Sequence, residues 1–270
     1  MYNGKVIYNP SGKAGEYSYW AANFYNGCSA RCEYCYNRKG VVAKVLGGDI
    51  PTLKKSLGTI EQAFHFFKIE VEKNLEELRR NGLFFNFVSD PFLDETRELN
   101  TWCMRYAMEL GIKVKSLTKQ TKWVGYFLMF SENIDKRIDV KNLFHIGFTL
   151  TGHDSLEPGA ATNLERIEAA TKLKAAGFKV WFSIEPIIDI ESSWKCIIQT
   201  SHISDLYKIG LQSGKKYDKH DIKVFMDNVI RITKNEFRSV PVYFKDSLLK
   251  QAGISRESLP SNCVDRTFNL

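Results

Sequence analysis

Hydrophobic residues between positions 60 and 81 recur at the spacing of a helix. Successive apolar residues stand three or four positions apart, which places them on one helical face; they are Phe64, Phe67, Val71, Leu75 and Leu78. The pair Asn81-Gly82 then supplies a common helix-ending signal. This pattern predicts an amphipathic helix that begins near Ile60.

Short apolar runs alternate with helical patterns along the rest of the chain. An aromatic first strand is predicted over residues 17–24, and later strands are predicted to begin near residues 83, 112, 143, 178, 205 and 240. Helices are predicted between them over residues 95–110, 122–138 and 162–177, and from residues 192 and 219. The box Thr162-x-x-Glu165 is typical of a helix start. Strand starts about 27 to 35 residues apart favour βαβ units and a parallel sheet.

The repeated strand–helix unit predicts an α/β fold in one domain. Right-handed crossovers curl such a sheet toward a barrel and bring the C-terminal ends of the strands to one face. We assign residues 1–250 to this domain, with a lead-in over 1–16 and a long loop over 25–58. Residues 251–270 are predicted to form a C-terminal tail.

The amino-acid composition limits the kinds of binding partner and the cellular compartment that we expect for this protein. The 270 residues are 44% hydrophobic and carry a net charge of +7, which fits either an anionic partner such as DNA or RNA or a solvated basic surface. The apolar run 126–130 is far too short to span a membrane. The segment Met1 to Lys5 lacks the apolar region of a signal peptide, so we expect a cytoplasmic protein whose thiols are reduced.

Three cysteines, Cys28, Cys32 and Cys35, fall within eight residues. A structural zinc site usually takes four ligands in two distant pairs, whereas three thiolates can hold a [4Fe–4S] cluster and leave one iron open to a further ligand. Zinc completed by a distant His or Cys, and cysteines that merely fill the core, are the alternatives. Cys103 and Cys196 lie on predicted helices and are expected to be buried.

The motif Cys28-x3-Cys32-x-Tyr34-Cys35 resembles the cluster motif of the radical S-adenosylmethionine (SAM) enzymes. Further segments, in the same order, are similar to the spore photoproduct lyase-like branch, often labelled DNA-repair photolyase-like. They include Tyr8 to Tyr17, Asn23 to Gly27, Ser89-Asp90-Pro91, Leu117-Thr118-Lys119, Glu157 to Ala160, Glu165 to Ala169 and Ser183 to Pro186. The resemblance covers about residues 6 to 250.

This resemblance implies a partial, open TIM-type barrel of about six βα units with a short C-terminal addition. It implies a [4Fe–4S] cluster on the three cysteines, SAM as second cofactor, and a reducing electron donor such as flavodoxin or ferredoxin. Reductive cleavage of SAM would give a 5′-deoxyadenosyl radical that takes hydrogen from a substrate, and the expected substrate is a nucleic-acid base. A small molecule or peptide substrate is the alternative, and a zinc-bound nucleic-acid-binding module without catalysis is a third reading.

Polar residues follow the predicted strands and are the candidate cofactor ligands: Tyr34, Ser89, Asp90, Lys119, Thr149, Ser183 and Glu185. By the resemblance, Asp90 accepts from the SAM amine, although it could instead cap the next helix. Lys119 pairs with the SAM carboxylate, and Tyr34 flanks the adenine. Thr149 and Ser183 contact ribose or adenine, and Glu185 would be costly to bury without a partner. Arg166 is interpreted as a surface ion-pair residue.

Two further hypotheses concern the substrate. Spore photoproduct lyases carry a cysteine near the second strand end; residues 86–90 contain none, so Cys263 in the tail is the candidate hydrogen donor and repair of that lesion is disfavoured. The basic segment from Arg38 to Lys55 contains Lys39, Lys44 and Lys54 and is predicted to contact nucleic-acid phosphates.

Overall fold

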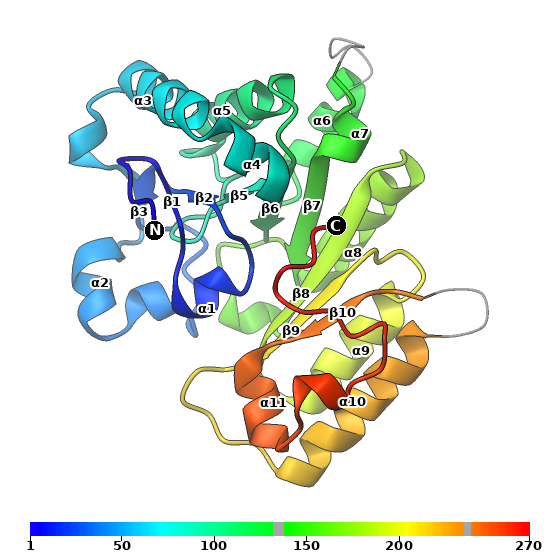
Figure 1. The fold of residues 1–270 in the computed structure, drawn as a ribbon. Coiled ribbons are helices and arrows are strands. Elements are labelled where there is room, and N and C mark those ends of the chain that lie inside the picture. Colours follow the sequence, from blue (N-terminus) through cyan, green and yellow to red (C-terminus); the bar gives the residue numbers. More distant parts are fainter. Residues whose placement is uncertain (132–137, 235–238) are drawn as a thin grey trace.

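One mostly parallel sheet runs through the molecule (Figure 1). The computed structural model describes residues 1–131, 138–234 and 239–270. Within these ranges the eight-stranded sheet has the order β1-β2-β5-β6-β7-β8-β9-β10. Its strands are β1 (Ile7–Tyr8), β2 (Ala21–Ala22), β5 (Leu83–Phe85), β6 (Val114–Thr118), β7 (Phe144–Thr149), β8 (Lys179–Ile187), β9 (Tyr207–Leu211) and β10 (Val242–Phe244). A separate pair joins β3 (Tyr25–Asn26) to β4 (Thr52–Leu53).

Every neighbouring pair from β2 to β10 is parallel, and only β1 runs antiparallel to its neighbour β2. Each strand from β5 onward pairs with the next strand in the chain, so the order never reverses along this part of the sheet. The predicted α/β class and the parallel sheet are confirmed.

Helices cover the outer side of the sheet (Figure 1). The described helices are α1 (Gly12–Gly15), α2 (Gly40–Leu46), α3 (Ile60–Lys73), α4 (Leu75–Asn81), α5 (Arg97–Glu109), α6 (Trp123–Ser131), α7 (Val140–Leu143), α8 (Asn163–Ala175), α9 (Ile190–Thr200), α10 (Lys219–Thr233) and α11 (Asp246–Ala252). Short 3-10 turns are η1 (Tyr36–Arg38), η2 (Lys55–Leu57), η3 (Asp154–Leu156) and η4 (Arg256–Ser258). No helix in the described ranges is long and apolar enough to cross a membrane.

Most predicted elements after residue 83 appear within a few positions of their expected bounds. The capping box at Thr162 is confirmed, because its hydroxyl accepts from Glu165 N while the Glu165 carboxylate accepts from Thr162 N. The helix expected over 60–81 is divided at Asn74, whose side chain donates to Glu70 O at 2.8 Å. The end of the helix expected over 122–138 lies outside the described residues between 132 and 137.

The first strand is much shorter than the predicted segment 17–24, since only Ala21–Ala22 pairs within the main sheet. At the start of this segment the ammonium of Lys208, from β9, donates to the carbonyls of Glu16 at 3.2 Å and Tyr17 at 2.9 Å. These carbonyls therefore bind a buried side chain in place of a strand neighbour. The long loop expected after the cysteines also differs, because it contains α2, β4 and η2.

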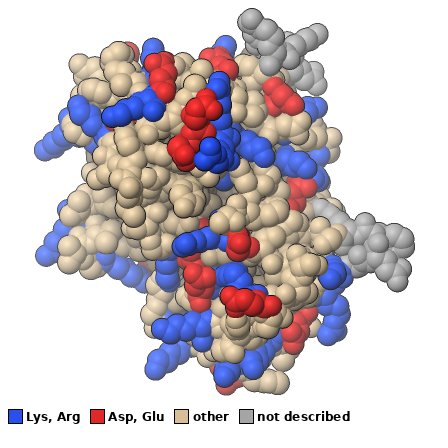
Figure 2. All heavy atoms as spheres, in the orientation of Figure 1, with Lys and Arg blue, Asp and Glu red and all other residues tan. Residues whose placement is uncertain are grey.

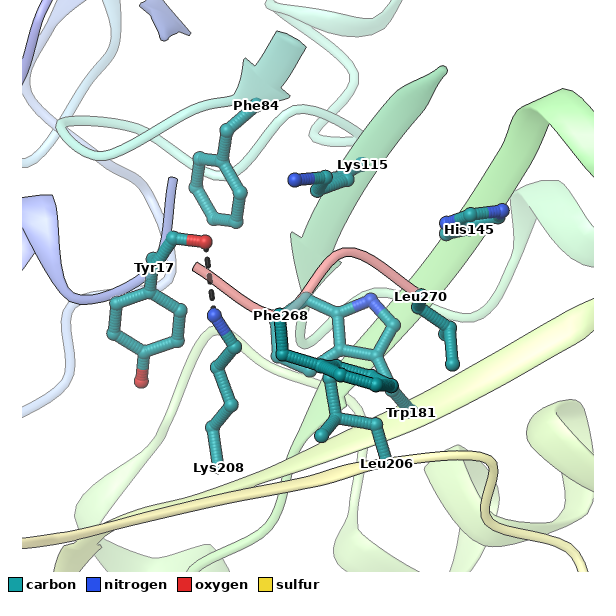
Figure 3. A pocket seen from close by; sticks show the side chains of 9 residues that line it. All are labelled: Tyr17, Phe84, Lys115, His145, Trp181, Leu206, Lys208, Phe268 and Leu270. Atoms are coloured by element: carbon teal, nitrogen blue, oxygen red, sulfur yellow. Dashed lines mark hydrogen bonds between the residues drawn. The ribbon is translucent and has the colours of Figure 1, made fainter. Parts of the chain in front are cut away.

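The inner side of the sheet is aromatic and basic. A small cavity there is lined by Tyr17, Phe84, Lys115, His145, Trp181, Leu206 and Lys208, and by Phe268 and Leu270 of the C-terminal segment (Figure 3). The last residues of the chain thus pack inside the sheet, in a cluster with Trp181 and Phe84. The end of the predicted C-terminal tail is thus half-buried against the sheet through Phe268 and Leu270.

Candidate functional site

The loop that carries Cys28, Cys32 and Cys35 is held by the chain that follows it. Gly27 N donates to Leu46 O at 2.8 Å, and Cys28 N donates to Gly48 O at 2.9 Å. Gly27 has a φ of +81°, and a Cβ at this position would lie 2.6 Å from Ile50 O. Within the loop Arg31 has a φ of 50°, the single positive value among the described non-glycine residues. The turn and the close backbone contact fix the path of the loop.

Cys32 is buried, whereas Cys28 and Cys35 are half-buried, and all three thiols are free. Burial raises the pKa of Cys28 to about 11, and the negative charge of Asp90 adds to the shift. Burial also raises the pKa of Cys35. The Cys32 thiol lies against Ala30 O at 3.9 Å. Within the described ranges no group of three or more His, Cys, Asp or Glu side chains is arranged to hold a metal ion, so the cysteine ligand set stays a prediction.

A second segment, between β7 and α8, packs directly on the cysteine loop. Glu33 N donates to Leu156 O and Gly159 N donates to Ala30 O, both at 3.0 Å. A Cβ at Gly159 would collide with Ser29 O. Only glycine permits this approach of the two backbones, so the segment is a fixed wall of the site.

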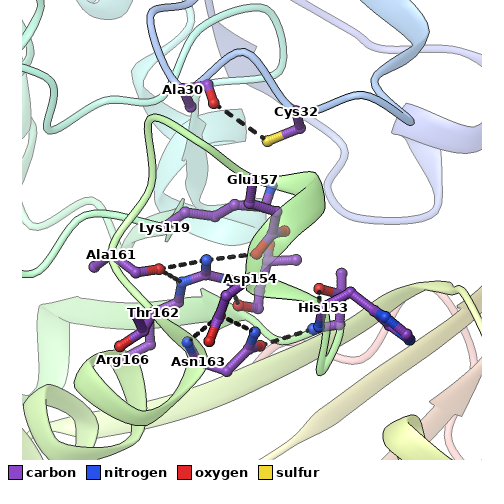
Figure 4. Close-up of polar contacts among 12 residues, drawn as sticks. Ala30, Cys32, Lys119, His153, Asp154, Glu157, Ala161, Thr162, Asn163 and Arg166 are labelled. Atoms are coloured by element: carbon purple, nitrogen blue, oxygen red, sulfur yellow. Dashed lines mark hydrogen bonds and ion pairs between the residues drawn. The ribbon is translucent and has the colours of Figure 1, made fainter.

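Beneath the cysteine loop lies a buried ion pair (Figure 4). Arg166 Nη2 is 2.5 Å from Glu157 Oε2, and both side chains have an exposed fraction of 0%. Arg166 also donates to the carbonyls of Thr149 and Ala161, each a neighbour of the site. The interpretation of Arg166 as a surface residue is wrong, because its guanidinium is surrounded by carbonyls and a carboxylate that no sequence spacing revealed.

Tyr34 connects this ion pair to the cysteine loop. Its hydroxyl donates to Glu157 Oε1, and its ring lies 5.6 Å from the ammonium of Lys119. Burial, followed by the negative charge of Glu157, raises the pKa of Tyr34 well above its usual value. The phenol is therefore neutral and acts as a hydrogen-bond donor.

Lys119 follows β6 and points toward the cysteine loop (Figure 4). Burial lowers its pKa, but the interactions with the Cys32 sulfur and with the carboxylates of Glu157 and Asp90 outweigh this effect, so the pKa lies above its ordinary value. Within the described part of the chain its ammonium forms no hydrogen bond or ion pair. A charged, desolvated ammonium without a direct anionic partner is suited to an anionic ligand.

Asp90 is engaged by the protein itself. Its Oδ1 accepts from Phe92 N at 3.0 Å and Thr118 Oγ1 at 2.7 Å, and its Oδ2 accepts from Lys119 N at 2.7 Å. Burial raises the pKa of Asp90 more than these hydrogen bonds lower it. The alternative interpretation as a helix cap is wrong, because the N-cap of α5 is Thr96. Asp90 fastens the end of β6, with one acceptor site on Oδ2 to spare.

The other candidate ligands fall into two places. Ser89 Oγ is buried beside Asp90 and has no hydrogen-bond partner among the described residues. Thr149 and Ser183 are register partners in β7 and β8. Ser183 Oγ is hydrogen-bonded to Tyr17 OH at 2.7 Å, which places it in a second polar group.

This second group surrounds Glu185. Tyr17 OH donates to Glu185 Oε2 at 2.5 Å, and Lys245 Nζ lies 2.7 Å from the same atom. The ion pair with Lys245 offsets the free-energy cost of burying this carboxylate. Sequence reasoning missed Tyr17 and Lys245 as partners, because no local pattern connects residues so far apart in the chain.

The remaining cysteines lie away from the site. Cys103 and Cys196 are buried on α5 and α9, as expected. Cys263 pairs with Val242 at the start of β10, whereas Lys245 follows the end of that strand. The structure therefore does not bring Cys263 to the face that carries the cysteine loop.

The assembled residues form a polar, largely desolvated site. It combines three thiols and a buried ion pair with two groups that have no hydrogen-bond partner among the described residues, the ammonium of Lys119 and the hydroxyl of Ser89. Soft thiol donors beside a cation are suited to a soft metal and an anionic ligand. No protein-family model, curated protein or solved structure matches this chain.

Proposed function

We propose that this protein is a radical SAM enzyme with an open, partial barrel of about six βα units. The single observation that carries the proposal is that Lys119 and Asp90, from two strand ends, meet the cysteine loop. Both were selected from the sequence as SAM ligands. Their convergence on Cys28 and Cys32 is what a cofactor site built on this loop requires.

The strand order of the sheet supports the proposed barrel. Strands β5 to β10 follow one another in chain order, as in singly wound barrels, where doubly wound sheets reverse. The lead-in segment adds to this, since Lys245 donates to Lys13 O at 3.2 Å and Lys208 donates to Tyr17 O. Residues 13–17 therefore lie beside β9 and β10, between them and the first strands of the sheet.

The residues present fit the proposed cluster by their donor chemistry. Three thiols on one short loop, beside the cation of Lys119, match the thiolate ligands that iron–sulfur clusters prefer. Cys28, Cys32 and Cys35 would hold the cluster, and they must lose their protons and turn toward one another to do so. When bound, the cluster would supply the electron that cleaves SAM to methionine and a 5′-deoxyadenosyl radical.

The protein's own residues would bind and orient SAM. Lys119 would hold the carboxylate, because its ammonium lies at the cysteine loop and forms no hydrogen bond or ion pair with another described residue. The free acceptor site of Asp90 and the orphan hydroxyl of Ser89 would take the amine. Thr149, together with Ser183, would contact ribose or adenine, and Tyr34 would keep Lys119 in place from below.

The proposed substrate class is inferred from the net charge of the protein. A net charge of +7 favours an anionic substrate such as a nucleic-acid base in DNA or RNA, with a small molecule or peptide as the alternative. A target base must leave the stack to reach such a site, which favours damaged or single-stranded nucleic acid.

The test is anaerobic reconstitution followed by reaction with SAM and dithionite. We expect a brown protein with about four irons and four sulfides per chain, and release of 5′-deoxyadenosine and methionine. A colourless protein that binds zinc, or an iron-loaded protein that leaves SAM intact, would overturn the proposal.

A further inference from the structure

Helix α2 exposes an apolar surface. None of its residues is buried, although its sequence is mainly valine, alanine and leucine. Val41 and Val45, one helical turn apart, are 77% and 65% exposed, and Ile50 is 68% exposed. We call the exposed apolar residues of this segment the α2 patch: Tyr36, Val41, Val42, Val45 and Ile50. Exposed apolar residues gathered on one segment mark an interaction surface.

The α2 patch is attached to the cysteine loop at both ends. Helix α2 begins five residues after Cys35, through the short turn η1. Its last residue, Leu46, accepts from Gly27 N, and Gly48 accepts from Cys28 N. A partner bound to the α2 patch would therefore lie against the outer side of the loop that carries the three thiols.

Positive charge borders the α2 patch. Lys39 and Lys44 are exposed, and Figure 2 shows blue and tan side chains over the region of α2. The acid of this segment, Asp49, is paired with Arg38. A basic border around an apolar centre complements an acidic protein surface.

Nucleic acid fits this surface less well than the sequence indicated. Lys54 is turned inward, donates to Asn23 O at 2.5 Å and has a pKa lowered by burial, so it is not available to a phosphate. Branched aliphatic side chains gain little against a charged sugar–phosphate backbone. A second copy of this chain would bring the same lysines to the interface, where like charges repel.

We propose that the α2 patch is the docking surface for a small acidic one-electron carrier protein. This inference rests on the proposed function, which needs one electron per SAM cleaved. The carrier's redox group would lose one electron, the cluster would gain it, and no atom would be transferred. A surface limited to one seven-residue helix and its flanking residues suits a weak, transient complex, as is usual for electron transfer.

The test is calorimetric titration of the full chain with oxidised flavodoxin at low and high salt. We expect binding that weakens as salt is added. Val41→Asp with Val45→Asp should weaken it by about tenfold or more, since it places charge at the centre of the interface. Lys39→Glu with Lys44→Glu should also weaken it and reduce its salt dependence.

Matched controls are Ile198→Asp on α9 and Val224→Asp on α10, which replace aliphatic residues that are 46% and 44% exposed on other helices. Their affinity for flavodoxin should equal that of the parent. The proposal is overturned if flavodoxin does not bind, or if both α2 variants bind as the parent does.

Two other occupants are tested in parallel. Loss of single-stranded oligonucleotide binding, with flavodoxin binding intact, in the lysine variant would assign the surface to nucleic acid. A dimer that the valine variant dissociates would assign it to a second copy. Failure of SAM cleavage with dithionite counts against the proposed function alone, because the calorimetric titration does not depend on it.

Discussion

Arg166 and Glu157 form an ion pair of 2.5 Å in which neither side chain is exposed. Glu157 also accepts from Tyr34, so the pair ties the start of α8 to the cysteine loop. Buried pairs of this kind are often neutral in net stability, yet removal of one partner leaves an uncompensated charge. We infer that the main role of the Arg166–Glu157 ion pair is to fix the position of the cysteine loop.

The first prediction follows from this pair. Arg166→Ala should lower the free energy of unfolding by roughly 3–5 kcal/mol, because Glu157 remains buried without its partner. Denaturant titration measures the loss. Arg166→Met combined with Glu157→Gln should recover part of it, and Arg105→Ala, which breaks an exposed pair with Glu109, should change stability little. Equal effects of the Arg166 and Arg105 variants would contradict the assigned role.

The second prediction concerns the cysteines. Replacing Cys28, Cys32 and Cys35 by alanine should abolish iron binding after reconstitution, because thiolates are the proposed ligands. Cys263→Ala is the control, since this half-buried cysteine lies beside Val242, away from the loop. Iron and sulfide analysis with the absorbance spectrum measures the outcome. Full iron content in the triple variant would eliminate the assignment.

The third prediction concerns Lys119. Lys119→Ala should weaken SAM binding to the loaded protein by roughly 1.5–3 kcal/mol, the range for a charge-assisted hydrogen bond. Its neighbour Lys122, which is exposed, is the matched control, and Lys122→Ala should bind SAM normally. Equilibrium binding of SAM measures both variants. Parent-like affinity in Lys119→Ala would show that another group holds the carboxylate.

The fourth prediction concerns acid stability. Burial, with the nearby charges of Lys113, Lys115 and Lys179, lowers the pKa of His145 from 6.5 to about 4. In the unfolded chain His145 takes up its proton near pH 6.5 and in the folded chain only near pH 4, so it removes stability as the pH falls through this window.

The full contribution is roughly 3 kcal/mol, at 1.36 kcal/mol for each pKa unit. Denaturant titrations of the parent and of His145→Gln between pH 7 and pH 4 isolate it, because other groups titrate alike in both. The variant should lose less stability than the parent across this range. Parallel curves would mean that folding does not lower the pKa of His145.

The parallel sheet was accessible to sequence reasoning because its strands are short apolar runs between amphipathic helices. The capping box could be predicted because it depends only on Thr162 and Glu165, three residues apart, and the structure contains it. Asp90 and Lys119 were selected because each follows a predicted strand, and the ends of parallel strands share one face. The structure brings these two residues together, since Asp90 accepts from Lys119 N.

What the sequence could not reveal depends on partners that are distant in the chain. The burial of Arg166 depends on where Glu157 folds, and the bond from Lys208 to the Tyr17 carbonyl, at the start of the expected first strand, joins residues far apart in the chain. Helix α2 was expected to be part of a loop, because seven residues flanked by glycines are too short for a helical repeat to be recognised in the sequence.

The contacts of Lys245 also constrain the order of events during synthesis. Lys245 binds Glu185 and the carbonyl of Lys13. The lead-in segment therefore cannot form this contact until a residue more than two hundred positions later has been synthesised. Until Lys245 has emerged from the ribosome, the carboxylate of Glu185 has no cation to pair with. Contacts this distant in sequence form slowly. The cysteine loop, by contrast, is held by Leu46, Gly48, Leu156 and Gly159, so its backbone contacts can form during synthesis well before the lead-in segment is anchored.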